Sequence, residues 1–192
     1  MKTKRLILYI VAAGSFLFIR CSREEKSIVN PPDENNLITN SSFEFNNNPS
    51  LDYWSDTSAD SSYVSFSRDA PTDGGNYSIR LKNEWTFPGT IVYYVIPPAG
   101  THRYRLSVYA KAKRHTPTSF AGGYMSLIQV SSGNSTVEKY LRFTDTTWTS
   151  GSLIDTLSTT SSDTLIIQLQ GNIDQWSYGD ILFDLCTFEK LD

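Results

Sequence analysis

Histidine and cysteine are scarce in this chain, with two of each among 192 residues. His102 and His115 have no spacing to another histidine or to a cysteine that would form a zinc site, so both are expected to be solvated surface residues. The two cysteines, Cys21 and Cys186, are expected to form no disulfide if Cys21 is modified. These shortages argue against chemistry based on histidine, thiolate or zinc, and they leave packing as the main source of stability.

The N-terminal apolar run is short for a membrane span. It covers residues 6–19, follows Lys2, Lys4 and Arg5, and has the length of a secretory h-region. We therefore expect residues 1–20 to be a signal peptide. Cys21 stands where bacterial lipoprotein signals end, and this resemblance implies an acylated Cys21. Residues 22–25 resemble the acidic tract that directs some lipoproteins to the outer cell surface, which implies a surface-exposed outer-membrane lipoprotein; a charged linker would look the same. Arg20 replaces the usual small residue, which leaves an uncleaved anchor as the alternative.

Basic residues are in the minority after the expected cleavage. Removal of residues 1–20 takes away four basic residues and no acidic ones, so the net charge falls from −3 to −7. A nucleic-acid partner is therefore not expected. Residues 22–35 are polar and contain Pro31 and Pro32, which predicts a flexible tether, so membrane attachment would be through the lipid alone.

No segment shows a sustained helical period. Short stretches rich in Val, Ile, Tyr, Phe and Thr are separated by Gly, Asn, Asp, Pro and Ser, and several alternate apolar with polar residues. In the segment 103–111, for example, Tyr104, Leu106 and Val108 share one face. The pattern predicts an all-β antiparallel sandwich over residues 36–190, with a first strand over 37–45 and a last one over 181–188.

Each of these two terminal strands contains one carboxylate in an apolar setting. Glu44 lies between two phenylalanines, and Asp184 lies between a phenylalanine and a leucine. Burial of either acid is unfavourable unless a cation or a hydrogen-bond donor meets it. If the two strands lie side by side, an oxygen-binding ion such as calcium could bind both acids.

Five short segments occur in an order that resembles a known family. They are residues 37–44, 74–81, 98–112, 143–149 and 183–185. In this order they resemble the carbohydrate-binding modules of the family four, nine and twenty-two type, over almost all of the expected domain. The resemblance implies a galactose-binding-domain-like jelly roll and a structural calcium site that includes Glu44 and Asp184. Leu185 departs from the family pattern, which has a second acid there.

The four tryptophans fall into two groups. Trp54 and Trp148 match family positions that are packed against the sandwich, so we expect them in the core. Trp85 and Trp176 lie in polar connections beside Asn, Asp and Gln, which fits a site where aromatic rings stack on a sugar. The alternative is that they close an open end of the sandwich.

Tyrosines supply further candidates. Tyr93 and Tyr94 must face opposite sides of one strand, so one can be in the core while Tyr94 is exposed. Tyr124 and Tyr140 are weaker candidates for carbohydrate binding, and packing is favoured for both. The leading hypothesis is a noncatalytic, surface-tethered module that binds a polysaccharide or other glycan. A structural or adhesive envelope domain is the alternative, and a jelly-roll glycoside hydrolase or lyase is the third.

Overall fold

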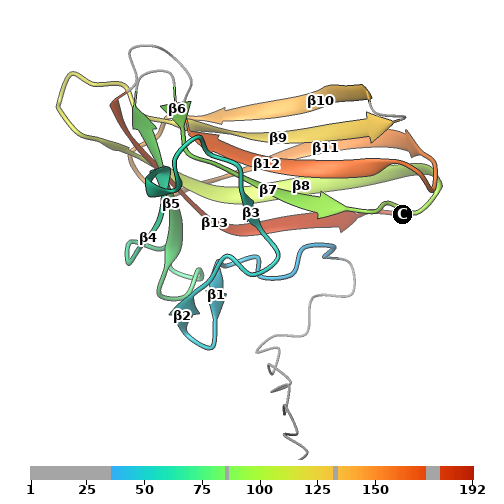
Figure 1. The fold of residues 1–192 in the computed structure, drawn as a ribbon. Helices are drawn as coiled ribbons and strands as arrows, with labels where there is room; N and C mark the ends of the chain where they lie inside the picture. The colour runs from blue at the N-terminus through green and yellow to red at the C-terminus, as the bar shows by residue number, and fades with distance from the viewer. Residues whose placement is uncertain (1–35, 85–86, 132–133, 172–177) are drawn as a thin grey trace, which may run out of the picture.

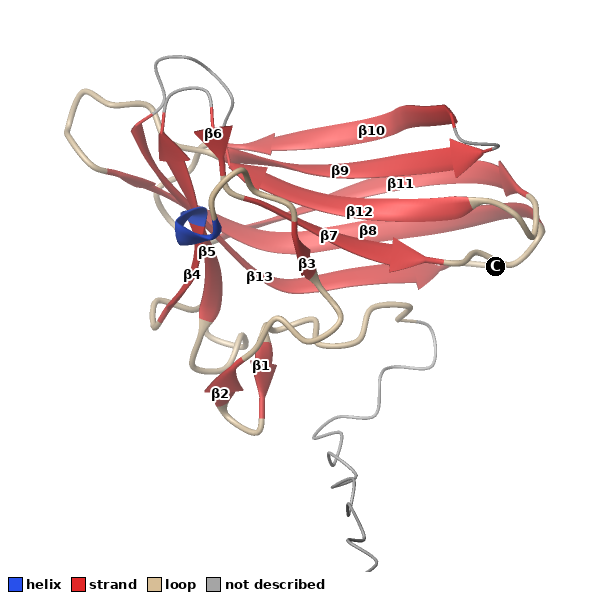
Figure 2. Ribbon diagram, in the orientation of Figure 1, coloured by secondary structure: helices blue, strands red, loops and turns tan. Residues whose placement is uncertain are grey.

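The computed structural model describes residues 36–84, 87–131, 134–171 and 178–192. Apart from one 3-10 turn, the regular structure in these residues consists of strands (Figure 2). The elements are β1 (Glu44–Phe45), β2 (Asn48–Pro49), β3 (Ser55–Asp56), η1 (Ser61–Tyr63), β4 (Val64–Ser67), β5 (Ser78–Glu84), β6 (Phe87–Pro88), β7 (Thr90–Val95), β8 (Gly100–Arg114), β9 (Gly123–Ser131), β10 (Asn134–Phe143), β11 (Thr149–Thr159), β12 (Thr164–Gly171) and β13 (Tyr178–Lys190).

Two sheets form the sandwich, and every strand pair in them is antiparallel. One sheet has the order β10-β9-β12-β7-β3, and the other has the order β11-β8-β13-β5-β4, with β6 paired to β5 (Figure 1). The hairpin β1-β2 stands apart from both sheets. The predicted all-β antiparallel sandwich is confirmed.

Period-two alternation places the core between the two sheets. On β7, Ile91, Tyr93 and Val95 are buried in the core, whereas Tyr94 is exposed. On β8, the face that carries Tyr104, Leu106 and Val108 is buried, as the sequence pattern predicts. The expectation that Tyr93 and Tyr94 face opposite sides is thus confirmed.

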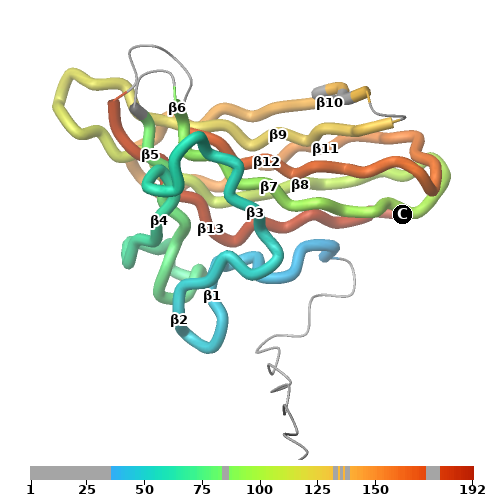
Figure 3. Tube along the Cα trace, viewed as in Figure 1, coloured from blue at the N-terminus to red at the C-terminus, as the bar shows by residue number. Residues whose placement is uncertain are grey.

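The two ends of the domain lie side by side, although the first expected strand is mostly irregular. Only Glu44–Phe45 of the predicted strand over 37–45 is a strand, because Asn40 and Phe43 have φ of 58° and 55°, in the left-handed region. The segment nevertheless follows β13: the Leu37 amide donates to the Phe188 carbonyl at 2.7 Å, and the Cys186 amide donates to the Ser41 carbonyl at 2.8 Å. Figure 3 shows this N-terminal segment beneath β13.

Trp54 lies in the core, as predicted. It is 6% exposed, its ring lies 5.1 Å from Phe43 and 5.3 Å from Tyr93, and its Nε1 donates to the Asn40 carbonyl. This aromatic cluster fixes the irregular N-terminal segment to β7. Trp148 is different from the expectation: it is only half-buried, lies outside the core cluster, and donates its Nε1 hydrogen to Asp69 at 3.0 Å.

Residues 1–35, which include the expected signal peptide, Cys21 and the tether, lie outside the described residues. Within the described ranges, no helix is long and apolar enough to cross a membrane. Cys186 is a free, buried thiol whose pKa is raised by burial.

Candidate functional site

The outer face of the five-stranded sheet presents a surface of tyrosines and neutral polar groups. Because Ile91, Tyr93 and Val95 point into the core, the alternate residues of β7 and their cross-strand partners point outward. Register then places one set of residues on this surface, which we call the sheet face: Ser55, Thr90, Val92, Tyr94, Tyr124, Ser126, Ile128, Val130, Tyr140, Arg142, Thr164, Ile166, Gln168 and Gln170.

Three tyrosines give the sheet face its aromatic area. Tyr94 is 55% exposed and Tyr140 is 65% exposed. Tyr124 contacts Tyr140 edge to face, with 5.9 Å between ring centroids, and the Arg142 guanidinium lies 5.8 Å from the centroid of the Tyr124 ring. The sheet face therefore has a pair of contacting aromatic rings at one end and a separate exposed ring at the other.

Neutral hydrogen-bonding groups lie between the aromatic residues. Gln168 donates from Nε2 to Oε1 of Gln170 at 2.9 Å, and register places Gln168 next to Ser126 and Gln170 next to Tyr124. Tyr94 and Tyr140 are three strands apart and offset by two residues along the strands, so their Cα atoms are separated by about 16 Å. The geometry suits an extended ligand laid across the strands.

The structure describes two of the four residues that the sequence nominated for carbohydrate binding. Tyr94 and Tyr124 are both on the sheet face, whereas Trp85 and Trp176 lie outside the described residues. Tyr140, for which packing was favoured, is exposed on the same face. Three further residues of the sheet face were not predicted from the sequence: Arg142, Gln168 and Gln170. Arg142 lies two residues after Tyr140 on β10 and therefore faces the same side of the sheet, and this alternation would have revealed it.

The two carboxylates of the terminal segments meet at a glycine turn. Glu44 accepts hydrogen bonds through Oε1 from the backbone amides of Asn76 and Tyr77. Gly75 has φ of 80°, and a Cβ atom there would lie 2.7 Å from Glu44 Oε1. Only glycine combines this backbone conformation with so close an approach.

Asp184 lies on the other side of the same turn and is fully buried. Its Oδ1 accepts the Leu185 amide hydrogen at 2.7 Å, whereas its Oδ2 has no hydrogen-bond partner. A Cβ atom on Gly74 would overlap Oδ2. Burial raises the pKa of Asp184 to about 8; the Leu185 amide opposes the rise, and the negative charge of Glu44 adds to it. A bound cation would oppose this rise, because it stabilises the charged carboxylate.

The donor set of this acidic site fits a hard cation such as calcium. Two carboxylates converge on one turn, and a buried carboxylate oxygen lacks a partner, which is the arrangement that an oxygen-coordinated ion stabilises. The described residues contain no cluster of three or more His, Cys, Asp or Glu side chains. An ion here would complete its coordination with neutral oxygen ligands, such as backbone carbonyls, amide or hydroxyl side chains, or water. Leu185, at the position of the missing second acid, is half-buried with φ of 48°.

No protein-family model matches the chain, and no curated protein matches it. Solved structures do. A family 16 carbohydrate-binding module is 22% identical with a TM-score of 0.54, over 80% of this chain and 99% of that one. The module TmCBM61, solved in complex with β-1,4-galactotriose, is 16% identical with a TM-score of 0.52, over 81% of this chain and 98% of that one.

A third similar structure is the enzymatically active domain of tailspike protein 4 from bacteriophage CBA120. It is 15% identical with a TM-score of 0.61, and the match covers 81% of this chain but only 21% of that chain. At such identities the likeness shows the fold alone. The chain therefore has the two-sheet, galactose-binding-like jelly roll of carbohydrate-binding modules, as the sequence predicted.

Proposed function

We propose that this chain is a noncatalytic module that binds a glycan on the sheet face. The single observation that carries the proposal is the alignment of Tyr94, Tyr124 and Tyr140 on one outer face of a carbohydrate-binding-module fold, with glutamine side chains between them. Flat aromatic rings stack on the apolar face of a pyranose, and amide or guanidinium groups bind its hydroxyls. The wide spacing of the rings favours an oligosaccharide over a monosaccharide.

Binding without hydrolysis is favoured by the charges on this face. A glycoside hydrolase of the common type needs two carboxyl groups on either side of the scissile bond. Among the described side chains that register places on the sheet face, Arg142 is charged and none is a carboxylate. Glu44 and Asp184 are held against backbone at the glycine turn instead.

The acidic site is proposed to hold a structural calcium ion through Glu44 and Asp184. This ion would neutralise two acids that meet inside the fold and would link the N-terminal segment to β13. Its role is thus stability of the scaffold, while recognition takes place on the opposite sheet.

The proposal also includes the site of action. A lipid on Cys21 and the tether over residues 22–35 would hold the domain at the outer surface of a bacterial outer membrane. A tethered module of this kind would retain glycan chains near the cell.

Affinity electrophoresis and calorimetry of the full chain against a panel of plant and microbial polysaccharides test the function. We expect at least one glycan to bind, and Tyr94→Ala combined with Tyr140→Ala to reduce its affinity at least tenfold. Phe120→Ala is the control, because Phe120 is an exposed aromatic outside the sheet face.

A separate variant, Trp85→Ala combined with Trp176→Ala, tests the site that the sequence nominated. If this variant alone abolishes binding, the sheet face is the wrong site. If the intact chain binds no glycan of the panel, a structural or adhesive domain becomes the better conclusion.

A further inference from the structure

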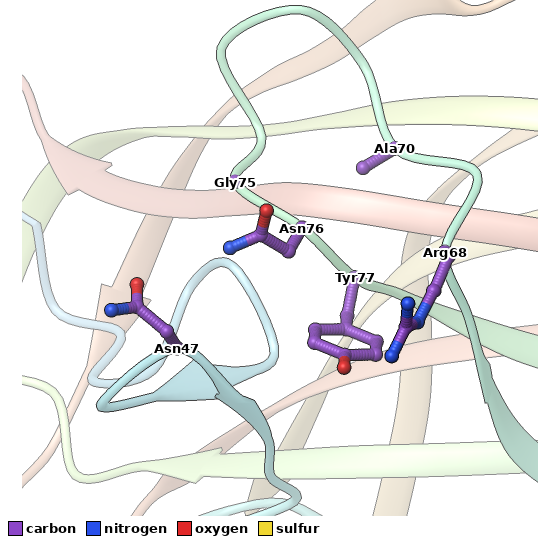
Figure 4. A pocket seen from close by; sticks show the side chains of 6 residues that line it. All are labelled: Asn47, Arg68, Ala70, Gly75, Asn76 and Tyr77. Atoms are coloured by element: carbon purple, nitrogen blue, oxygen red, sulfur yellow. The ribbon is translucent and has the colours of Figure 1, made fainter.

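A pocket lies at the end of the sandwich that carries β1 and β2, away from the sheet face. It has a volume of about 430 Å³, within the range of small-ligand sites, and is open to solvent. We call it the loop pocket; its lining residues are Asn47, Arg68, Ala70, Gly75, Asn76 and Tyr77 (Figure 4). Asn47 follows β1, whereas the other five residues belong to the connection between β4 and β5.

Its side chains combine a cation, an aromatic ring and two amides. The Arg68 guanidinium lies 5.7 Å from the centroid of the Tyr77 ring. Arg68 is exposed, and no carboxylate lies within ion-pair distance of it in the described part of the chain. Figure 4 shows Asn76 between Asn47 and Tyr77, with Arg68 beside the Tyr77 ring.

No acidic side chain lines the loop pocket, although the chain as a whole is acidic. An anion can therefore approach Arg68 without facing a carboxylate in the lining. A guanidinium binds a carboxylate with charge-assisted hydrogen bonds, while the amides of two asparagines suit hydroxyl groups. The ring of Tyr77 offers area for stacking.

The shape of the pocket does not depend on these side chains alone. The backbone amides of Asn76 and Tyr77 are bound to Glu44 Oε1, so the wall of the pocket is fixed from behind by a residue that does not line it. Gly75 and Asn47, with φ of 80° and 60°, hold the turns on either side. A pocket whose walls are fixed before binding loses less entropy when a ligand is bound.

We propose that the loop pocket is a second sugar subsite, distinct from the sheet face, and that it binds a monosaccharide unit bearing a carboxylate, a hexuronic acid. Arg68 binds the carboxylate, Tyr77 contacts the ring, and Asn47 and Asn76 bind hydroxyls. The volume accommodates one such unit at the end or at a branch of a glycan.

The test is an amide-resolved NMR titration of the full chain with glucuronate, with glucose, acetate and sulfate in separate titrations. Glucuronate is expected to shift the amide signals of residues 75–77 saturably, at least tenfold more tightly than glucose or acetate. Arg68→Ala is expected to weaken glucuronate about tenfold. Arg103→Ala is the matched control, because it removes the same charge from an exposed position on β8.

Equal binding of acetate, sulfate and glucuronate would show an anion site only and would overturn the sugar assignment. No shift of residues 75–77 with glucuronate, or an unchanged affinity in Arg68→Ala, would overturn the proposal. Tyr94→Ala combined with Tyr140→Ala should leave this titration unchanged. The experiments can therefore refute the loop subsite and the sheet-face function independently of each other.

Discussion

The sheet face and the loop pocket are built in opposite ways within one small domain. On the sheet face, the antiparallel register of β7, β12, β9 and β10 sets which side each residue faces, with one irregularity between Val137 and Lys139. At the loop pocket, order comes from unusual backbone conformations. Asn47 and Gly75 have φ of 60° and 80°, and Glu44 binds the backbone amides of Asn76 and Tyr77.

The two regions also differ in charge. The described side chains of the sheet face are neutral except for Arg142, whereas the loop end holds two acids against a glycine turn. A site built on strands needs no ion to keep its shape. A site built on a turn between two carboxylates depends on whatever neutralises them, so the two regions should respond differently to calcium, pH and substitution.

Among the substitutions, the largest effect on stability is expected from Gly74→Ala. The added Cβ would overlap Asp184 Oδ2 and would also lie 2.6 Å from Pro71, so the glycine turn must shift at a cost of about 3 kcal/mol in the free energy of unfolding. Urea unfolding measures this loss. Thr72→Ala, at an exposed position of the same connection, is the control and should change stability by less than about 0.5 kcal/mol.

In folded Gly74→Ala protein, glycan affinity at the sheet face should be unchanged, while the loop-pocket amides should shift. Loss of both sites would contradict the independence of the two regions.

Calcium should stabilise the chain through Glu44 and Asp184. At a free calcium concentration one hundred times Kd, the free energy of unfolding should rise by about 2.7 kcal/mol. Asp184→Asn should abolish the rise, because it removes one of the two charges that the ion binds. Thermal unfolding with calcium, magnesium and EDTA measures the effect.

Asp155→Asn is the matched control, since Asp155 pairs with Lys139 at the edge of the sandwich. If calcium stabilises Asp184→Asn as much as the native chain, then the ion does not bind through Asp184. An internal hydrogen bond would then be the better explanation for the burial of Asp184.

In EDTA, stability should fall as pH rises. Asp184 has a pKa of about 8 in the folded state because of its burial, well above its ordinary value of about 4. Between these values the folded state holds a proton that the unfolded state has lost, so the stabilisation present below pH 4 is lost by about pH 8. The slope contributed by this one group is up to about 1.4 kcal/mol per pH unit.

Urea unfolding from pH 4 to pH 9 should show this slope in the native chain and not in Asp184→Asn. Saturating calcium should flatten the curve, because the ion replaces the proton. The same slope in both proteins would mean that Asp184 is not the titrating group.

The strands were predictable because each carries its own period-two pattern. The face shared by Tyr104, Leu106 and Val108, and the opposite orientations of Tyr93 and Tyr94, depend on neighbours along the chain. The first strand was not predictable in the same way. Asn40 and Phe43 adopt positive φ because Trp54 and β13 bind the segment, and these contacts come from distant parts of the chain.

The candidate sites show the same limit. Tyr94 and Tyr124 could be nominated one strand at a time, but the grouping with Arg142 and Gln170 requires the cross-strand register. The resemblance indicated Glu44 and Asp184 as a pair. It could not indicate that Gly74 and Gly75 separate them, because that depends on how the connection between β4 and β5 folds over β13.

The smallest effects, and the sharpest test of the comparison, come from single tyrosines on the sheet face. Tyr94→Ala and Tyr140→Ala should each reduce glycan affinity about tenfold, or about 1.4 kcal/mol, through loss of one stacking ring. Because the two residues are about 16 Å apart on a rigid sheet, the losses should add to within about 0.5 kcal/mol in the double variant. Calorimetry of the two single variants and the double variant measures this.

Tyr94→Phe and Tyr140→Phe keep the ring and should retain most of the affinity, which separates stacking from hydrogen bonding by the hydroxyl. A coupling well above 0.5 kcal/mol would mean that the ligand or the sheet rearranges on binding. In that case the sheet face would not be fixed before binding. The contrast with the loop pocket, whose turn depends on an ion, would then be wrong.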